Sequence, residues 1–94
     1  MEELMRMRDA LRVRRDELEV ALERASVVRL DAFRAIDAAN RPLNDDEFNT
    51  LVEAYDEARE ETDTIEAKLE EINDDLTTLS DAISIYYKWR REGL

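Results

Sequence analysis

The sequence has no cysteine and no histidine, and it has only one glycine and one proline among its 94 residues. Without cysteine, disulfides, thiolate metal sites and cysteine nucleophiles are excluded. Without histidine, the commonest general base and the commonest transition-metal ligand are missing. The scarcity of glycine and proline leaves little turn chemistry for β-structure, and good helix formers dominate the composition. We therefore predict an all-α protein that binds no cofactor and no metal.

Charge is abundant but unevenly distributed, and it is mostly of one sign. The formal net charge is -11. Residues 1–40 hold eight arginines against nine acidic residues, whereas residues 41–94 hold six basic residues against sixteen acidic ones. A nucleic-acid-binding surface needs Lys and Arg to neutralise phosphates, so we expect no nucleic-acid partner for this acidic protein.

Long apolar runs are also missing. No run approaches the roughly 20 residues that a membrane-spanning helix needs. The N-terminus, which begins Met1-Glu2-Glu3-Leu4, does not resemble a secretory signal. We therefore expect a cytoplasmic protein without a membrane partner.

What the sequence does contain is a coiled-coil pattern in each half. From residue 48 to residue 86, apolar or small residues alternate three- and four-residue spacing: Phe48, Leu51, Tyr55, Ala58, Thr62, Ile65, Leu69, Ile72, Leu76, Leu79, Ile83 and Tyr86. A similar series in the first half reads Leu4, Met7, Leu11, Arg14, Leu18, Ala21, Ala25, Val28, Ala32, Ala35 and Ala39. Such a series, here called a seam, is typical of a coiled-coil helix.

The two helices are predicted to span residues 2–40 and 45–92, joined by a turn over residues 40–44. Pro42 cannot continue a helix, Asn44 is a good N-cap, and Glu47 is in position for a capping box. Gly93 is the expected stop of the second helix. A turn this short makes the helices antiparallel neighbours, so we predict a single-domain, two-helix coiled-coil hairpin over residues 1–94. A three-helix fold, with a break near residues 73–78, is the alternative.

Several large apolar residues lie off the seam of the first helix, and they indicate self-association. These candidate self-association residues are Val13, Val20, Val27, Leu30 and Phe33. The three valines recur every seven residues, so they share a helix face. We expect two hairpins to form a homodimeric four-helix bundle. A third helix that packs back within the chain, or a groove for a partner, would also cover this face.

The end of the hairpin opposite the turn is the candidate binding site for another protein. It combines Met5 with Ile85, Tyr87, Lys88, Trp89, Arg90 and Arg91. Trp, Tyr and Arg are enriched at interface hot spots, and Met adapts to irregular surfaces. The alternative interpretation is structural: Trp89 would pack over the N-terminus, and the basic residues would complement the C-terminal end of the helix.

Two resemblances to known families add further hypotheses. The segment Arg41-Pro42-Leu43-Asn44-Asp45-Asp46-Glu47-Phe48, with the seam that follows to Ile72, resembles the helical-hairpin scaffolding-type segments of phage capsid proteins. This resemblance implies a phage origin and a role in assembly. Leu11-Arg12, followed by Leu18, Leu22 and Arg29, resembles the first helix of small all-helical chorismate mutases. This second resemblance implies an enzyme whose Arg12 and Arg29 contact substrate carboxylates, although Asn40 stands where that family has a lysine.

Taken from the sequence, the expected function is non-enzymatic: a helical hairpin that binds another protein. A structural assembly or scaffolding protein is the first alternative, and a small helical enzyme of the chorismate mutase type is the second. The acidic residues of the second half are expected to form a solvated face rather than a metal site, because neither a calcium loop with its glycine turn nor a Glu-His di-metal motif is present.

Overall fold

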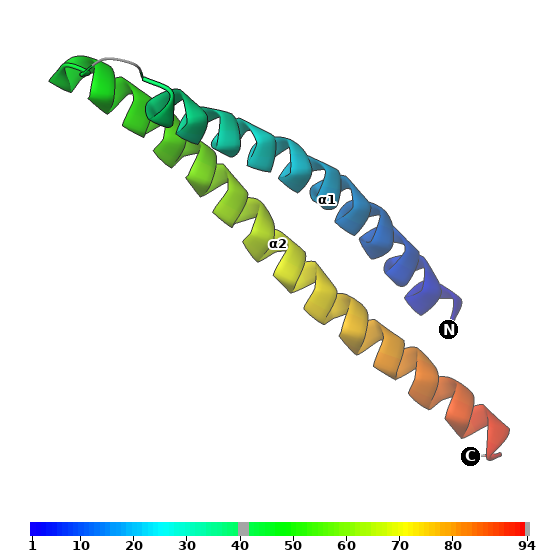
Figure 1. The fold of residues 1–94 in the computed structure, drawn as a ribbon. Helices are drawn as coiled ribbons and strands as arrows, with labels where there is room; N and C mark the ends of the chain where they lie inside the picture. Colours follow the sequence, from blue (N-terminus) through cyan, green and yellow to red (C-terminus); the bar gives the residue numbers. More distant parts are fainter. Residues whose placement is uncertain (40–41, 94) are drawn as a thin grey trace. The chain divides into compact units, whose positions relative to one another are not determined.

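The computed structural model describes residues 1–39 and 42–93, and they form two helices, α1 (Glu2–Asp37) and α2 (Asp45–Arg91) (Figure 1). The described residues contain no strand. The two helices pack against each other as a hairpin, which confirms the predicted all-α hairpin fold. The three-helix alternative is wrong, because α2 is continuous through residues 73–78.

Helix α2 passes through its weakest helix-forming segment, residues 73–78, without a break. Thr77 Oγ1 donates a hydrogen bond to the Asn73 carbonyl oxygen at 3.0 Å, and Thr78 Oγ1 donates to the Asp74 carbonyl oxygen at 3.1 Å. These bonds satisfy the hydroxyl groups but slightly destabilise a helix, so they do not account for its continuity. The seam residues Ile72, just before the segment, and Leu76, within it, are covered by packing, and this tertiary contribution outweighs the low propensity.

The first helix ends earlier than predicted. It was expected to reach Asn40, but it ends at Asp37, where the Ala38 N–H donates to the Arg34 carbonyl oxygen at 2.8 Å. The predicted turn over residues 40–44 begins at Asn40 and Arg41, which lie outside the described residues. Pro42 to Asn44 are not helical, as expected.

The start of α2 is capped by Asn44, and Glu47 lies at the capping-box position, as predicted. The Glu47 N–H donates to Asn44 Oδ1 at 2.8 Å, and Asn44 Nδ2 donates to Glu47 Oε1 at 2.7 Å. Three acidic residues in the first turn, Asp45, Asp46 and Glu47, favour this end of the helix dipole. At the other end, α2 stops at Arg91, one residue before the predicted Glu92. Gly93 then adopts a left-handed conformation with a φ of 74°, which confirms its expected role as the stop.

Replacing Asn44 by alanine is expected to lower the free energy of unfolding by about 1 kcal/mol, within the ~0.5–2 kcal/mol range of lost N-caps. The substitution removes the acceptor of the Glu47 N–H and leaves that donor without its cap. Urea denaturation followed by far-ultraviolet circular dichroism measures the loss. Asn49→Ala, at an exposed position inside α2, is the matched control, and an equal loss there would contradict a specific capping role.

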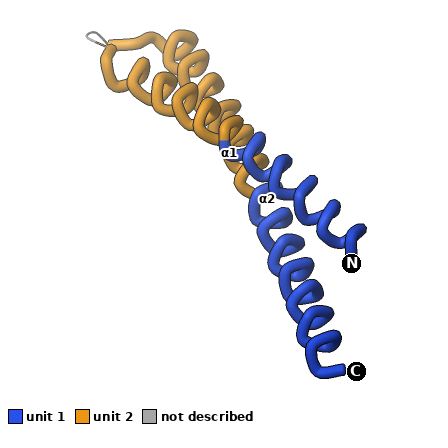
Figure 2. The backbone as a smooth tube through the Cα atoms, turned by 90° about the vertical axis from the view of Figure 1, so that its right-hand side faces the viewer, with its two compact units in different colours: residues 1–19, 68–94 blue, residues 20–67 orange. Residues whose placement is uncertain are grey.

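The chain divides into two compact units, shown in Figure 2. Unit 1 consists of residues 1–19 and 68–94, and unit 2 consists of residues 20–67. Each unit contains one stretch of α1 packed against one stretch of α2. Unit 2 holds the connection between the helices, and unit 1 holds both chain ends (Figure 2).

The predicted seam of α2 is confirmed from Leu51 to Tyr86. Every one of its residues in that range is buried or half-buried. In unit 2 the most covered are Ala58, Thr62 and Ile65, and in unit 1 they are Leu76 and Ile83. Phe48, the first predicted seam residue, is 48% exposed. Helix α1 ends at Asp37, before it could cover this part of α2.

The seam of α1 differs from the prediction at five of its eleven positions. The expected residues Leu4, Leu11, Leu18, Ala21, Ala25 and Ala32 are covered, but Met7, Arg14, Val28, Ala35 and Ala39 are exposed. The covered stripe instead includes the residues at Arg8, Arg15, Leu22, Arg29 and Ile36. Arginine can serve at such positions because its aliphatic stem covers apolar surface while the guanidinium group reaches towards water. The predicted seam followed the apolar series and therefore left out Arg8, Arg15 and Arg29, although it included Arg14.

The ion pairs of α1 are local. Arg14 Nη1 lies 3.3 Å from Glu17 Oε2, and Arg15 Nη2 lies 3.4 Å from Asp16 Oδ1. The side chains of Arg14, Asp16 and Glu17 are mostly exposed, and the Arg15 side chain is 34% exposed. Pairs of this kind contribute well under ~1 kcal/mol each, so packing of the seam is what holds the helices together.

Candidate functional site

The C-terminal end of α2 is the most exposed apolar part of unit 1. In Figure 1 this end extends past the N-terminus of α1. Ile85 is 64% exposed, Trp89 is 59% exposed and Tyr87 is 51% exposed. Lys88, Arg90 and Arg91 are exposed as well, and Met5 on α1 is half-buried. The structure therefore leaves nearly all of the predicted protein-binding residues accessible.

These residues do not form one patch, because they lie on different faces of α2. Ile85 and Trp89 are four residues apart and share a face, as do Tyr87 and Arg91. Two residues along a helix correspond to about 200° of rotation, so Ile85 and Tyr87 point in nearly opposite directions. The predicted cluster thus separates into an Ile85–Trp89 face and a Tyr87–Arg91 face.

One of the predicted binding residues makes contacts within α2. The Arg90 guanidinium carbon lies 5.9 Å from the centre of the Tyr86 ring, and Arg90 Nη1 donates a hydrogen bond to the Tyr86 hydroxyl group at 3.2 Å. The Tyr87 ring meets the Tyr86 ring edge-on, with centroids 5.9 Å apart. These contacts hold the Tyr86 side chain, the last residue of the seam, in place. Arg90 therefore has a structural role here, while Ile85 and Trp89 have no such contact.

Next to the Ile85–Trp89 face, unit 1 has an apolar groove that the sequence interpretation did not predict. We call it the terminal groove, and it is lined by Met7, Ala10, Leu11, Asp75, Thr78 and Leu79. Its volume is about 540 Å³, and Asp75 is the one charged residue in its lining. Met7 is 49% exposed at its edge because the seam of α1 runs through Arg8 instead. The sequence analysis placed Met7, Leu11 and Leu79 in the core and so overlooked the groove.

A second, more polar hollow of unit 1 has a volume of about 440 Å³. It is lined by Arg12, Arg15, Asn73, Leu76, Thr77, Ser80 and Asp81. The Nε atoms of Arg8 and Arg15 are buried without a hydrogen-bond partner. Both arginines lie in the seam, and neighbouring atoms therefore cover the Nε–H of each guanidinium group.

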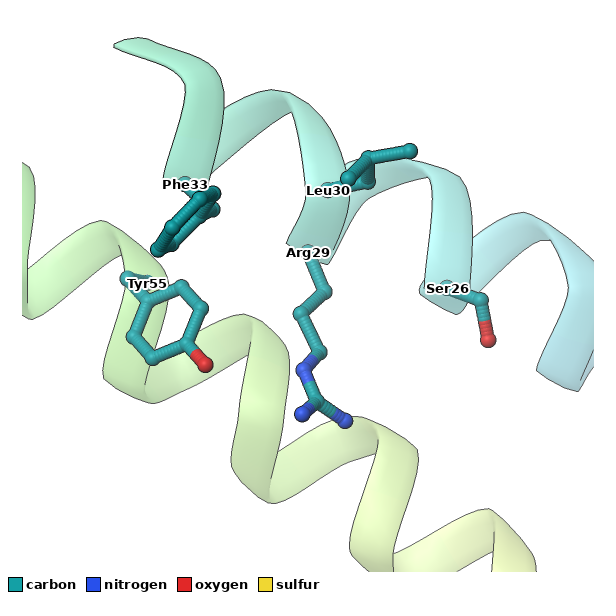
Figure 3. Close-up of a pocket in the computed structure, with 5 residues that line it drawn as sticks. All are labelled: Ser26, Arg29, Leu30, Phe33 and Tyr55. Carbon is teal, nitrogen blue, oxygen red and sulfur yellow. The ribbon is translucent and has the colours of Figure 1, made fainter. Parts of the chain in front are cut away.

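In unit 2, Phe33 and Arg29 form an aromatic pocket with Tyr55, shown in Figure 3. The Phe33 and Tyr55 ring centroids are 6.2 Å apart with their planes tilted by 55°, and the Arg29 guanidinium carbon is 6.0 Å from the Tyr55 ring centre. Ser26 and Leu30 complete the lining, and Leu30 points away from α2 (Figure 3). The Tyr55 ring thus contacts both Arg29 and Phe33 of α1.

The predicted self-association residues are all exposed. Val13 is 59% exposed, Val20 is 48%, Val27 is 54%, Leu30 is 47% and Phe33 is 52%. Val20 and Val27 each follow a buried residue, Leu18 or Ala25, by two positions, which turns them about 200° away from the seam. Phe33 differs from the valines because it immediately follows half-buried Ala32 and its ring reaches Tyr55. The valines thus form an outer face, while Phe33 belongs to the edge of the helix pair.

The arginines that the chorismate mutase resemblance singled out are engaged within their own units. Arg12 Nη1 lies 4.0 Å from Asp9 Oδ1 in unit 1, and Arg29 stacks on Tyr55 in unit 2. Among residues 1–39 and 42–93, no group of three or more acidic side chains is placed to hold a metal ion.

Comparison with known proteins adds no relative. No known protein family matches the sequence, and no curated protein and no solved structure matches it either. In the part of the chain that the structure describes, neither helix has the length of apolar sequence required to cross a membrane.

Proposed function

We propose that this chain is a non-enzymatic protein-interaction module that binds another protein through the Ile85–Trp89 face and the adjoining terminal groove. The observation that carries this proposal is the exposure of Ile85 and Trp89, at 64% and 59%, on one helix face. Large apolar side chains that share a face, rather than lying singly on the surface, are typical of interaction sites. Tryptophan is among the residues most enriched at interface hot spots.

The total exposed area supports an interaction role. The chain exposes 7384 Å², whereas a compact monomer of 11.1 kDa exposes about 5,700 Å² by the usual scaling with mass. The excess, about 1,700 Å², is larger than the roughly 800 Å² that one partner contributes to a standard protein–protein interface. A hairpin of two helices has one shared seam, so its other faces depend on partners for burial.

Capture experiments with matched variants test the proposal. We expect the wild-type chain to retain a partner from a native lysate, and we expect Ile85→Asp and Trp89→Asp to lose it. Both positions are exposed, so the helical circular dichroism signal should not change. Val20→Asp, exposed on α1 in unit 2, is the control and should retain the partner. Capture that is the same for all four proteins would exclude this face as the binding site.

A second candidate function, structural assembly through self-association, is favoured by the outer face of α1. Val20, Val27 and Leu30 are each about half exposed there. Between residues 20 and 37, α1 carries three arginines and three acidic residues, whereas α2 carries ten acidic residues and one arginine between residues 45 and 67. Two copies that meet through α1 would bury the valines and keep the acidic faces of α2 apart. Such a homodimer would fit the scaffolding role that the phage-segment resemblance implies.

Sedimentation velocity at a low and a high protein concentration tests this second candidate. We expect the wild-type chain to shift from monomer towards dimer as the concentration rises, and we expect Val27→Asp to remain monomeric, because a buried carboxylate at the interface is unfavourable. Thr64→Asp adds the same charge at an exposed position of α2 in unit 2 and should still dimerise. A wild-type chain that stays monomeric at both concentrations would rule out the homodimer.

A further inference from the structure

From the charge and spacing around the terminal groove, we infer that its occupant is a basic amphipathic helix of another protein. The inference rests on the proposed interaction function and adds the chemistry of the partner. It starts from a second series of residues on α2, outside the seam: Glu71, Asp75, Thr78, Ala82, Ile85 and Trp89. These residues alternate four- and three-residue spacing, which is the spacing of a coiled-coil stripe.

The stripe joins the groove to the exposed apolar face. Asp75 and Thr78 line the terminal groove, and Ile85 and Trp89 continue along the same helix face. From α1, Met7 and Ala10 line the opposite wall of the groove, and Leu11 and Leu79 contribute apolar surface between the walls. The stripe is about 27 Å long at 1.5 Å per residue, which corresponds to about five turns of a helix laid along it. A third helix with apolar residues at three- and four-residue spacing matches this surface.

The charges beside the groove indicate that the partner carries positive charge where it contacts this chain. On α2 the stripe carries Glu71 and Asp75 beside the groove, and Lys68 lies on the same stripe one turn before Glu71, further from the groove. On α1, Glu3 lies one turn before Met7 on the same face. The next basic residue on that face of α1, Arg14, is paired with Glu17 at 3.3 Å. A docked helix therefore meets carboxylates on both sides of its apolar stripe, and lysine or arginine at its flanking positions would complement them.

The same charges argue against a second copy of this chain in the groove. The chain has a net charge of -11, so a second copy would bring a further acidic surface to the carboxylates at positions 3, 71 and 75. Like charges that face each other across an interface suppress association. The same carboxylates that repel a second copy of the chain attract a positively charged partner.

A pair of designed peptides tests the inference directly. Both peptides are helices of about three heptads with the same leucine seam and no tryptophan, and they differ only in carrying lysine or glutamate at the flanking positions. Trp89 is the only tryptophan of the protein, so its emission reports docking without a label. We expect the lysine peptide to shift the Trp89 emission to shorter wavelength and to bind at least about tenfold more tightly than the glutamate peptide. The difference should shrink as salt is added.

Variants of the protein locate the binding to the groove. Met7→Lys and Asp75→Lys should weaken binding of the lysine peptide by about tenfold or more, because each puts a cation beside the docked helix. Ser84→Lys is the control: it adds the same charge as Met7→Lys to an exposed position of α2 in unit 1 that does not line the groove, and its affinity should equal that of the wild type.

Three outcomes would overturn the inference: equal affinity for the two peptides, no binding of either, or a loss in Ser84→Lys as large as that in Met7→Lys. A dimer of the chain alone that Met7→Lys abolishes would also overturn it, because a second copy would then occupy the groove. If lysate capture through Ile85 and Trp89 persists in any of these cases, the interaction function stands and only the partner chemistry is wrong. If capture is lost as well, both proposals fail.

Discussion

Thr77→Pro is expected to lower the free energy of unfolding by about 3 kcal/mol or more. This is a large part of the total stability of a small domain, which is about 5–15 kcal/mol. Residue 77 lies inside the continuous α2, so proline removes the hydrogen bond from its N–H to the Asn73 carbonyl oxygen, and the ring clashes with that carbonyl group. The Thr77 hydroxyl bond to the same carbonyl oxygen, 3.0 Å long, is lost too. Proline also disfavours the helical conformation of the preceding residue, Leu76, which is only 8% exposed.

Urea denaturation followed by far-ultraviolet circular dichroism measures this loss, and Trp89 fluorescence follows unit 1 separately. Thr77→Ala is the matched control, and its stability should stay within about 0.5 kcal/mol of the wild type, because the position is exposed and alanine is a better helix former. A proline variant with an unchanged midpoint would mean that the chain is broken near residue 77, as in a three-helix fold.

Leu18→Ala is expected to cost about 2–5 kcal/mol, whereas Leu30→Ala is expected to cost less than about 1 kcal/mol. Both substitutions delete the same atoms from the same helix. Leu18 is 5% exposed in the seam, but Leu30 is 47% exposed on the outer side of α1. Removing the Leu18 side chain loses its burial and leaves a cavity, and a hairpin with a single seam has few other apolar contacts to compensate.

The two leucine variants are compared by urea denaturation at low protein concentration, where self-association through the outer face contributes least. The wild type and both variants should share one m-value, so that the difference in midpoint reports stability alone. Similar losses in Leu18→Ala and Leu30→Ala would contradict the assignment of the seam of α1.

The buried face of helix α2 was largely predictable because its sequence contains one long series of apolar residues at coiled-coil spacing. From Leu51 to Tyr86 the apolar residues recur without a competing series as long, and the structure covers all of them. The cap at Asn44 and the stop at Gly93 were predictable for a different reason: they depend on local hydrogen bonds and backbone conformation, which neighbouring residues determine.

The surface at the C-terminal end of α2 could be predicted only in part. Its residues are exposed, as expected, but Ile85 and Trp89 share a face that excludes Tyr87, and Arg90 holds Tyr86. Neighbours in sequence were taken as neighbours on the surface, whereas helical rotation separates them. The terminal groove escaped prediction altogether, because it exists only where Met7 is left outside the seam.

The sequence by itself determined the class of fold and the positions of the cap and stop of α2, because periodicity and local hydrogen bonding act over a few residues. Packing of the seam decided the continuity of α2 through residues 73–78, where the sequence left a break open. The tertiary structure decided which face of α1 turns inward. Two stripes compete there, one through Met7, Arg14 and Val28 and the other through Arg8, Arg15 and Arg29. Hydrophobicity favours the first, but packing against α2 selects the second, since arginine stems can cover a seam while their charges reach water. That choice leaves Met7 at the surface and so creates the groove on which the proposed partner binding depends.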